Sequence, residues 1–282
     1  MQKSSVLRGT ERQILVFGGP YSNSRALLAL RSRAQALGIP EDRCYCTGDV
    51  VAYGSEPEET VGILRDWGCR VIAGNCEEQL ATGAADCGCG FAAGSECERL
   101  SKGWYAFADQ RLSRASRAWM SGLPKTLTFR EGGVSFRVIH GGIDAVNRFV
   151  FASDHDLIAA ELARAETDVV VAGHCGLPFI GRVGSRVWFN PGVIGMPAND
   201  GTADGWYGLI KGEAGRVSLA TRRLAYDFEA AARAMFAHGY ADDYARALVS
   251  GLWPSLDILP AAERSVAGTR IEEAARLIDL CA

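Results

Sequence analysis

The chain has 282 residues, of which 48% are hydrophobic and 22% charged, which is enough for a well-buried core and near the upper limit for one domain. Its 30 basic and 33 acidic residues leave a formal net charge of −3, without the basic surplus expected of a nucleic-acid-binding protein. Residues 1–12 are polar and lack the apolar stretch of a secretory signal, and no run of about 18 apolar residues occurs, so we expect a cytoplasmic protein with no membrane partner.

The first part of the chain alternates between predicted strands and helices. Short apolar runs indicate strands, and apolar residues at helical spacing that end at a glycine indicate helices. In chain order we predict a strand at 13–17, a helix at 24–37, a strand at 43–46, a helix at 58–67 and a strand at 70–73. A loop rich in Gly, Ala and Cys at 81–95 and one helical stretch at 101–120 follow.

Hairpin patterns dominate the rest of the chain. We predict strands at 127–130 and 134–140 around a Glu-Gly-Gly turn, a helix at 154–166, strands at 169–172, 179–183, 187–190, 207–210 and 217–220, and helices at 228–236 and 244–252. Alternation that gives way to hairpins predicts an α/β fold with layered mixed β-sheets flanked by helices. We expect one domain over residues 1–252, with residues 253–282 as an extension that packs on it or contacts a partner, which would be compatible with a homodimer.

Residues that can bind a metal follow four of these strands, each beside a glycine. In open α/β sheets, ligands bind outside the carboxyl ends of strands, and glycine lets the backbone approach an ion or a phosphate closely. A single histidine after a strand is more often a hydrogen-bonded core residue, but four such positions in series favour a site. They are Gly48-Asp49, Gly74-Asn75, His140-Gly141-Gly142 and Gly173-His174.

The order of these motifs resembles the calcineurin-like metallophosphoesterase family. That family carries an Asp-x-His block, then Gly-Asp, Gly-Asn-His-Asp/Glu, His-Gly and Gly-His-x-His. The corresponding segments after the first block are Gly48-Asp49, Gly74-Asn75-Cys76-Glu77, His140-Gly141 and Gly173-His174-Cys175-Gly176. Residues 190–195 and 226–231 also resemble a turn and the final helix of the small bacterial branch, so the resemblance spans residues 14–252 and implies the family's fold.

The resemblance implies one complete metal site and one that has been lost. The ligands of the first ion fall on Asp49, Asn75, His140 and His174. Those specific to the second ion fall on Gly19, Tyr21 and Gly176, which cannot reproduce its ligation, although Tyr21 as a phenolate is an alternative.

The family's third-block histidine, which assists phosphoryl transfer, is Cys76 in this chain. The resemblance therefore assigns catalytic roles to Cys76 and His140. We also expect substrate contacts at Asn75, Tyr53 and Gly19.

The four ligands of the first site comprise one carboxylate, one amide oxygen and two imidazoles. This donor set suits Zn, Mn, Fe or Ni and leaves coordination positions open for water. An ion in such a site acidifies water toward pH 7 and polarises a phosphoryl oxygen. A two-metal clamp would not be available in its usual form.

Nine cysteines without an export signal disfavour structural disulfides. Five of them offer a second route to a metal, as a Cys-bound Zn or Fe or an iron–sulfur cluster: Cys76, Cys87, Cys89, Cys97 and Cys175. Their spacing matches no standard zinc pattern, and the alternative is a reduced loop that packs over the mouth of the site. A cysteine nucleophile lacks an activating base in the neighbouring sequence.

Three functions follow from this pattern. The first is a metal-dependent phosphoesterase-like hydrolase that acts on a small phosphate ester or nucleotide through an altered metal centre. The second is a metalloprotein that uses Cys-bound Fe or Zn for different chemistry. The third is a catalytically inactive binding or regulatory protein, because a fold does not by itself fix a function.

Overall fold

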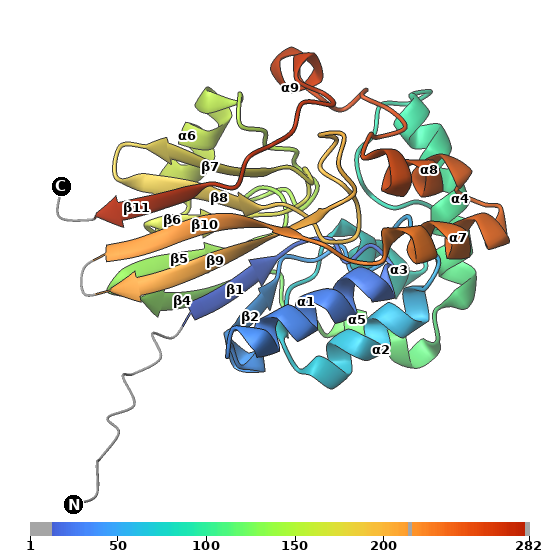
Figure 1. Cartoon of the computed structure of the whole chain (residues 1–282), viewed down its shortest axis with the longest axis horizontal. Coiled ribbons are helices and arrows are strands. Elements are labelled where there is room, and N and C mark those ends of the chain that lie inside the picture. Colours follow the sequence, from blue (N-terminus) through green and yellow to red (C-terminus); the bar gives the residue numbers. More distant parts are fainter. Residues whose placement is uncertain (1–12, 214–215, 280–282) are drawn as a thin grey trace, which may run out of the picture.

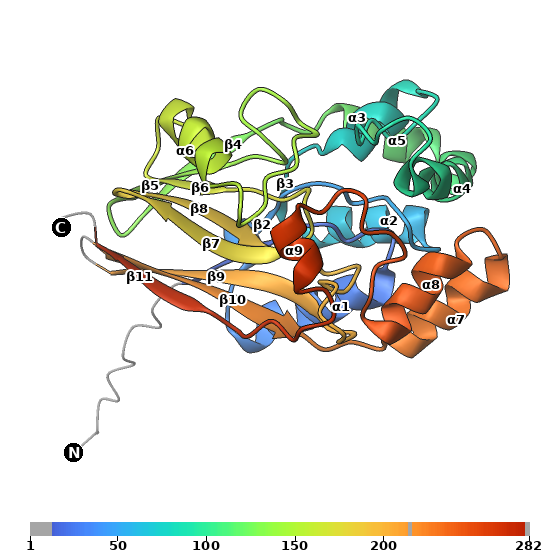
Figure 2. The same ribbon diagram turned by 90° about the horizontal axis from the view of Figure 1, so that it is seen from above.

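The computed structural model describes residues 13–213 and 216–279. It consists of two β-sheets that pack face to face, with helices around them (Figures 1 and 2). The predicted α/β fold of layered mixed sheets flanked by helices is therefore confirmed. The polar segment 1–12 and Cys281 lie outside the described residues.

The first sheet has six strands in the order β11-β10-β9-β1-β2-β3. Its parallel part comprises β1 (Gln13–Phe17), β2 (Cys44–Cys46) and β3 (Arg70–Val71). Its antiparallel part comprises β9 (Gly205–Glu213), β10 (Arg216–Leu224) and β11 (Ala275–Asp279).

The second sheet has five strands in the order β4-β5-β6-β8-β7. The central strands β5 (Val134–Val138), β6 (Val169–Val171) and β8 (Arg186–Pro191) run parallel. The edge strands β4 (Leu127–Glu131) and β7 (Pro178–Val183) pair with them antiparallel. Each sheet thus contains a parallel group of strands whose carboxyl ends lie together.

The helices form the outer layers and one end of the molecule. In chain order they are α1 (Ser24–Ala36), the 3-10 turn η1 (Glu41–Arg43), α2 (Pro57–Trp67), α3 (Asn75–Thr82), α4 (Glu96–Arg111), α5 (Arg114–Ser121), α6 (His155–Arg164), α7 (Phe228–His238), α8 (Asp242–Ser250) and α9 (Ala261–Ser265). Both views place α3, α4, α5, α7 and α8 at the same end. Within the described ranges, no helix combines the length and apolar character needed to cross a bilayer.

Strand β1 shows how the layers are held together. Ile14 and Val16 belong to the core between the two sheets, whereas Leu15 and Phe17 belong to the core beneath the helices. Each of these side chains is at most 2% exposed, so both faces of the strand are buried. Burial of this kind stabilises the fold by about 1.5–3 kcal/mol per large apolar side chain.

The predicted helix at 101–120 is wrong as a single element. The structure has two helices there, α4 and α5, with the chain extended at Ser113. The Ser113 side chain caps α5 by accepting a hydrogen bond from the backbone N–H of Ser116, and its own backbone N–H donates to the Glu58 carboxylate at 3.0 Å. A serine that caps a helix start favours a new helix over continuation of the old one.

The C-terminal segment packs along the rest of the chain. Strand β11 pairs with β10, and the backbone N–H of Ser153 donates to the Glu263 carboxylate at 2.9 Å. The sequence pattern predicts no strand within residues 253–282, so β11 is an addition that the structure makes. A domain boundary at residue 252 and a contact with a partner stay predictions.

Asn23 connects the start of α1 to a loop far along the chain, and substitution of Asn23 should destabilise the fold. Its Oδ1 accepts from the Ala26 N–H at 3.1 Å, and its Nδ2 donates to the Gly195 carbonyl at 3.2 Å, all within a buried environment. We expect Asn23→Ala to lower the free energy of unfolding by about 1–3 kcal/mol in urea denaturation. Ser32→Ala on the exposed face of α1 should change it by less than about 0.5 kcal/mol, and equal stability of both variants would contradict this role.

Candidate metal centre

Four loops at the carboxyl ends of parallel strands form the candidate site. Asp49 follows β2 and Asn75 opens α3 after β3, while His140 follows β5 and His174 follows β6. The first two strands belong to one sheet and the last two to the other. The site therefore lies where the ends of the two sheets meet, as the sequence predicts for these four residues.

Glycines allow these loops to approach one another. A Cβ atom on Gly48 would lie 2.5 Å from the Gly74 backbone nitrogen, and one on Gly74 would lie 2.5 Å from Oδ1 of Asp49. Asp49 and His174 themselves have φ angles of 54° and 62°, in the left-handed region that non-glycine residues rarely adopt. Strained backbone of this kind is typical of functional sites.

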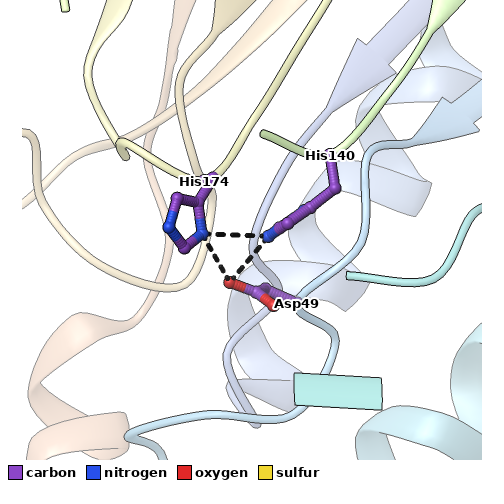
Figure 3. A group of neighbouring side chains, drawn as sticks. All are labelled: Asp49, His140 and His174. Carbon is purple, nitrogen blue, oxygen red and sulfur yellow. Dashed lines mark hydrogen bonds and ion pairs between the residues drawn. The ribbon is translucent and has the colours of Figure 1, made fainter. Parts of the chain in front are cut away.

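Asp49, His140 and His174 converge on one point (Figure 3). Nε2 of His140 lies 3.2 Å from Asp49 Oδ2 and 3.1 Å from Nδ1 of His174, which in turn lies 3.9 Å from the same Oδ2. Among the residues with described coordinates, these three form the one group of His, Cys, Asp or Glu side chains with donor atoms within 4.8 Å of one another.

A backbone carbonyl fixes which nitrogen of His140 faces this point. Nδ1 of His140 lies 2.6 Å from the carbonyl oxygen of Thr47, which can only accept, so Nδ1 carries the proton. Nε2 then presents its lone pair to Asp49 Oδ2 and to Asn75 Oδ1, the latter at 3.0 Å. Lone pairs that converge at these distances require a shared proton or a cation between them. The donor set therefore fits a divalent metal ion.

The buried charges of the group influence one another. Burial alone would raise the pKa of Asp49, but the two imidazoles hold it well below its usual range. Burial lowers the pKa of His140, yet the Asp49 carboxylate outweighs it, so the pKa of His140 is raised. Burial lowers the pKa of His174 and favours its neutral form. The raised pKa of His140 favours a proton on Nε2 shared with Asp49 while no ion is bound, and a metal ion that binds there would displace this proton.

Asn75 is held with its oxygen toward the same point. Its Nδ2 donates to the Cys87 carbonyl at 2.8 Å and to Sγ of Cys89 at 3.2 Å. Because these partners accept from the amide nitrogen, Oδ1 must face His140. The loop at 81–95 thus orients the fourth predicted ligand.

Glu77 is a site residue to which sequence analysis gave no role. Its fully buried carboxylate accepts hydrogen bonds from the backbone N–H groups of Asp49 at 2.8 Å, Val50 at 2.8 Å, Val51 at 3.3 Å and Gly74 at 2.9 Å. Burial, with Asp49 nearby, raises the pKa of Glu77 to about 7. A glutamate three residues after the N-cap residue Gly74 supplies the return hydrogen bond of a capping box, and this spacing was the signal available in the sequence.

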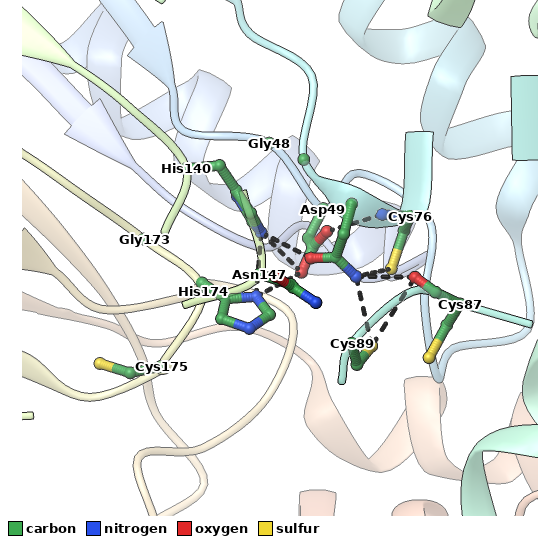
Figure 4. Close-up of polar contacts among 12 residues, drawn as sticks. Gly48, Asp49, Cys76, Cys87, Cys89, His140, Asn147, Gly173, His174 and Cys175 are labelled. Carbon is green, nitrogen blue, oxygen red and sulfur yellow. Dashed lines mark hydrogen bonds and ion pairs between the residues drawn. The ribbon is translucent and has the colours of Figure 1, made fainter. Parts of the chain in front are cut away.

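The five cysteines of the predicted second metal site do not all point to one place, although Cys89, Cys97 and Cys175 line the same pocket. Cys76 and Cys89 lie beside Asn75, whereas the side chain of Cys87 points away from it and its carbonyl points toward it (Figure 4). Cys175 lies on the far side of His174 with its sulfur directed away from the centre, and Cys97 lies on α4. A Cys-bound Zn or Fe stays a prediction.

Cys76, predicted to be catalytic, is a buried thiol. A hydrogen bond with Cys89 lowers the pKa of Cys76, but burial and Asp49 outweigh it and raise that pKa well above its usual value. The backbone N–H of Cys76 donates to Asp49 Oδ1 at 3.3 Å. A neutral thiol is a poor nucleophile and a poor base, so its role in proton transfer stays a prediction.

A pocket of about 70 Å³ opens beside Asp49 and His174. Its walls include six aromatic residues: Tyr21, Tyr53, Phe91, Phe149, Tyr244 and Trp253. Tyr53, one of the predicted substrate contacts, thus lines the pocket. Gly19, another, lies behind a ring, because a Cβ atom on it would be 2.5 Å from Cζ of Tyr21. Burial raises the pKa of Tyr21 well above its usual value, which favours a neutral phenol over a phenolate ligand.

Comparisons with known proteins agree with this fold. Residues 25–213 match the model of the calcineurin-like phosphoesterase superfamily domain. The fold is similar to the crystal structure of a metallophosphoesterase from Sphaerobacter thermophilus, with a TM-score of 0.68 and 20% identity over 86% of this chain and 99% of that chain. It is also similar to a hypothetical protein from Pyrococcus horikoshii, with a TM-score of 0.72 and 16% identity over 86% of this chain and 99% of that one.

One curated relative matches in sequence over a shorter stretch. An uncharacterized protein from Methanocaldococcus jannaschii is 37% identical over 62 residues, which are 22% of this chain and 25% of that protein. The match therefore spans a quarter of that relative's length.

Proposed function

The chain belongs to the calcineurin-like phosphoesterase superfamily, and from this we propose that it is a metal-dependent hydrolase of a small phosphate ester. The observation that carries the proposal is the fixed tautomer of His140. The Thr47 carbonyl fixes Nδ1 as the protonated nitrogen, so Nε2 and the oxygens of Asp49 and Asn75 converge as acceptors. This arrangement supports a bound cation and leaves a pocket beside it for a substrate.

Each residue has a distinct part in the proposed reaction. Asp49, Asn75, His140 and His174 would hold the ion. A divalent ion there, Zn, Mn, Fe or Ni, would polarise a phosphoryl oxygen and make water acidic enough to attack near neutral pH. The Thr47 carbonyl orients His140, and Glu77 holds the backbone of the Asp49 loop in place.

We propose a single ion. The positions that the resemblance assigns to a second ion include Gly19 and Gly176, which have no side-chain donor, and the ring of Tyr21 lies over Gly19. At the positions that the resemblance assigns, Asp49 therefore has no side chains beside it that could ligate a second ion. A second, Cys-bound ion would need the thiols to reorient.

Metal content and hydrolysis together test the proposal. Protein freed of metal and then reconstituted with Mn²⁺ or Zn²⁺ should bind one equivalent per chain and hydrolyse 4-nitrophenyl phosphate, and a chelator should abolish both. Two equivalents would contradict the single site. Absence of binding after reconstitution would contradict the hydrolase and favour a binding protein. Iron with visible absorption that disappears in Cys87→Ser and Cys89→Ser variants would favour the cysteine site instead.

A further inference from the structure

Two aromatic rings occupy the side of Asp49 where the second set of ligands is missing. A Cβ atom on Gly19 would lie 2.5 Å from Cζ of Tyr21, and one on Gly176 would lie 3.3 Å from Cζ2 of Trp253. Both rings line the pocket together with Asp49. Aromatic rings thus lie where the resemblance places the second set of ligands.

Trp253 is fixed in place by hydrogen bonds from the molecule itself. Its indole N–H donates to the Pro197 carbonyl at 2.7 Å, and its backbone N–H donates to Oδ1 of Asn199 at 2.8 Å. The indole N–H is already hydrogen-bonded, so the ring offers an apolar face and needs no further polar partner. A wall that is ordered before binding costs little conformational entropy when a ligand arrives.

Tyr21 is ordered by neighbouring rings. It packs edge-on against Tyr53 with ring centroids 4.8 Å apart, and Tyr53 packs against Tyr244 at 4.5 Å. All three rings line the pocket. Offset and edge-on arrangements at these separations are the favourable geometries for aromatic groups, and a further ring in the pocket would meet the same kind of surface.

The pocket carries almost no positive charge of its own. None of its lining residues within the described ranges is lysine or arginine. The one histidine of the lining, His174, belongs to the group that would bind the metal ion. A phosphoryl group bound here would have the ion as its cationic partner, and the rest of the molecule would lie against apolar rings. Beyond the phosphoryl group, the lining that the structure describes offers only hydroxyl groups of tyrosines and Ser255 as side-chain partners, so a second charged group of the ligand would be buried without an opposite charge.

We propose that this pocket binds an aryl group carried close to the phosphoryl group, so that the substrate is an aryl phosphate ester. This inference rests on the proposed hydrolase function and specifies its substrate class. The rings of Tyr21 and Trp253 stack on the aryl ring. The phosphoryl oxygens lie at the metal site formed by Asp49 and the two histidines. Trp253, from the C-terminal segment, acts as a specificity residue.

Binding of two phosphonates tests the proposal without any turnover. Phenylphosphonate and methylphosphonate carry the same charged group, and neither has an ester bond to hydrolyse. Calorimetric titration of the Mn²⁺-loaded full chain should show phenylphosphonate binding on the order of tenfold more tightly or better. Equal affinities for the two compounds would overturn the proposal.

Variants assign the preference to the ring. Trp253→Leu should weaken phenylphosphonate binding on the order of tenfold and leave methylphosphonate binding and metal content unchanged, whereas Trp253→Phe should retain most of the preference. Phe236→Leu, which changes an exposed aromatic residue on α7, is the matched control and should have no effect. An unchanged preference in Trp253→Leu would overturn the proposed role of Trp253. Failure of the hydrolase function would appear separately, as a persisting phenyl preference without turnover of 4-nitrophenyl phosphate.

Discussion

Asp49→Asn should lower the turnover of 4-nitrophenyl phosphate on the order of 10³-fold. Asp49 provides the carboxylate among the four proposed ligands, and the others are a neutral amide and two imidazoles. The substitution keeps the size of the side chain and removes its charge, so a divalent ion loses its anionic partner in a buried site. Loss of several kcal/mol of transition-state stabilisation corresponds to a rate effect of about this size. Steady-state kinetics with saturating Mn²⁺, together with metal titration, measures both consequences.

The matched control for this variant is Asp66→Asn on the exposed face of α2. It removes the same charge from the chain and should leave turnover and metal affinity unchanged. Asp49→Asn should also reduce the stability of the metal-free fold near neutral pH, because it removes the carboxylate that pairs with His140 in a buried environment. Full activity in Asp49→Asn would contradict the assignment of the metal centre.

The convergence of Asp49, His140 and His174 was predictable because its signals are local. Each proposed ligand lies within four residues of the end of a strand and has a glycine beside it, and the carboxyl ends of parallel strands meet in space. The contact between the Gly48 and Gly74 loops explains why glycine is needed at both places. These short patterns depend little on the rest of the chain, and the comparison with known proteins supports the same fold.

The direction in which each thiol points was not predictable. Cys87 and Cys89 are separated by one residue, yet the first presents its carbonyl to Asn75 and the second its sulfur. That difference depends on the backbone path of a glycine-rich loop, in which Gly88 and Gly90 have positive φ angles. Composition alone indicates a cluster of cysteines, whereas the backbone path decides the direction of each thiol.

Contacts between distant segments also left no pattern in the sequence. Trp253 lies against Gly176, and neither the tryptophan nor the glycine has neighbours in sequence that indicate the pairing. Glu77 is different, because its spacing from Gly74 is the capping-box pattern. The sequence pattern at the start of α3, like the patterns at the strand ends, therefore indicates that Glu77 positions the site.

Glu77→Ala should lower the free energy of unfolding of the metal-free protein by about 3–5 kcal/mol. The carboxylate accepts from four buried backbone N–H groups, and its removal leaves these donors without their partner. Glu77→Gln should fall between wild type and Glu77→Ala, because one amide oxygen remains and the NH₂ group faces donors. Urea denaturation with a chelator present measures these effects apart from any metal contribution.

The same variants separate folding from metal binding. Glu59→Ala, on the exposed face of α2, is the control and should change stability by less than about 0.5 kcal/mol. If Glu77 positions the Asp49 loop, Glu77→Gln that remains folded should also bind Mn²⁺ about 10–100-fold more weakly, as is usual when a group that supports a metal ligand is lost. Asp49→Asn should weaken Mn²⁺ binding more than Glu77→Gln does, because Asp49 is a proposed ligand whereas Glu77 holds the backbone of its loop. Wild-type stability in Glu77→Ala would mean that water satisfies the four N–H groups and that the loop does not depend on this carboxylate.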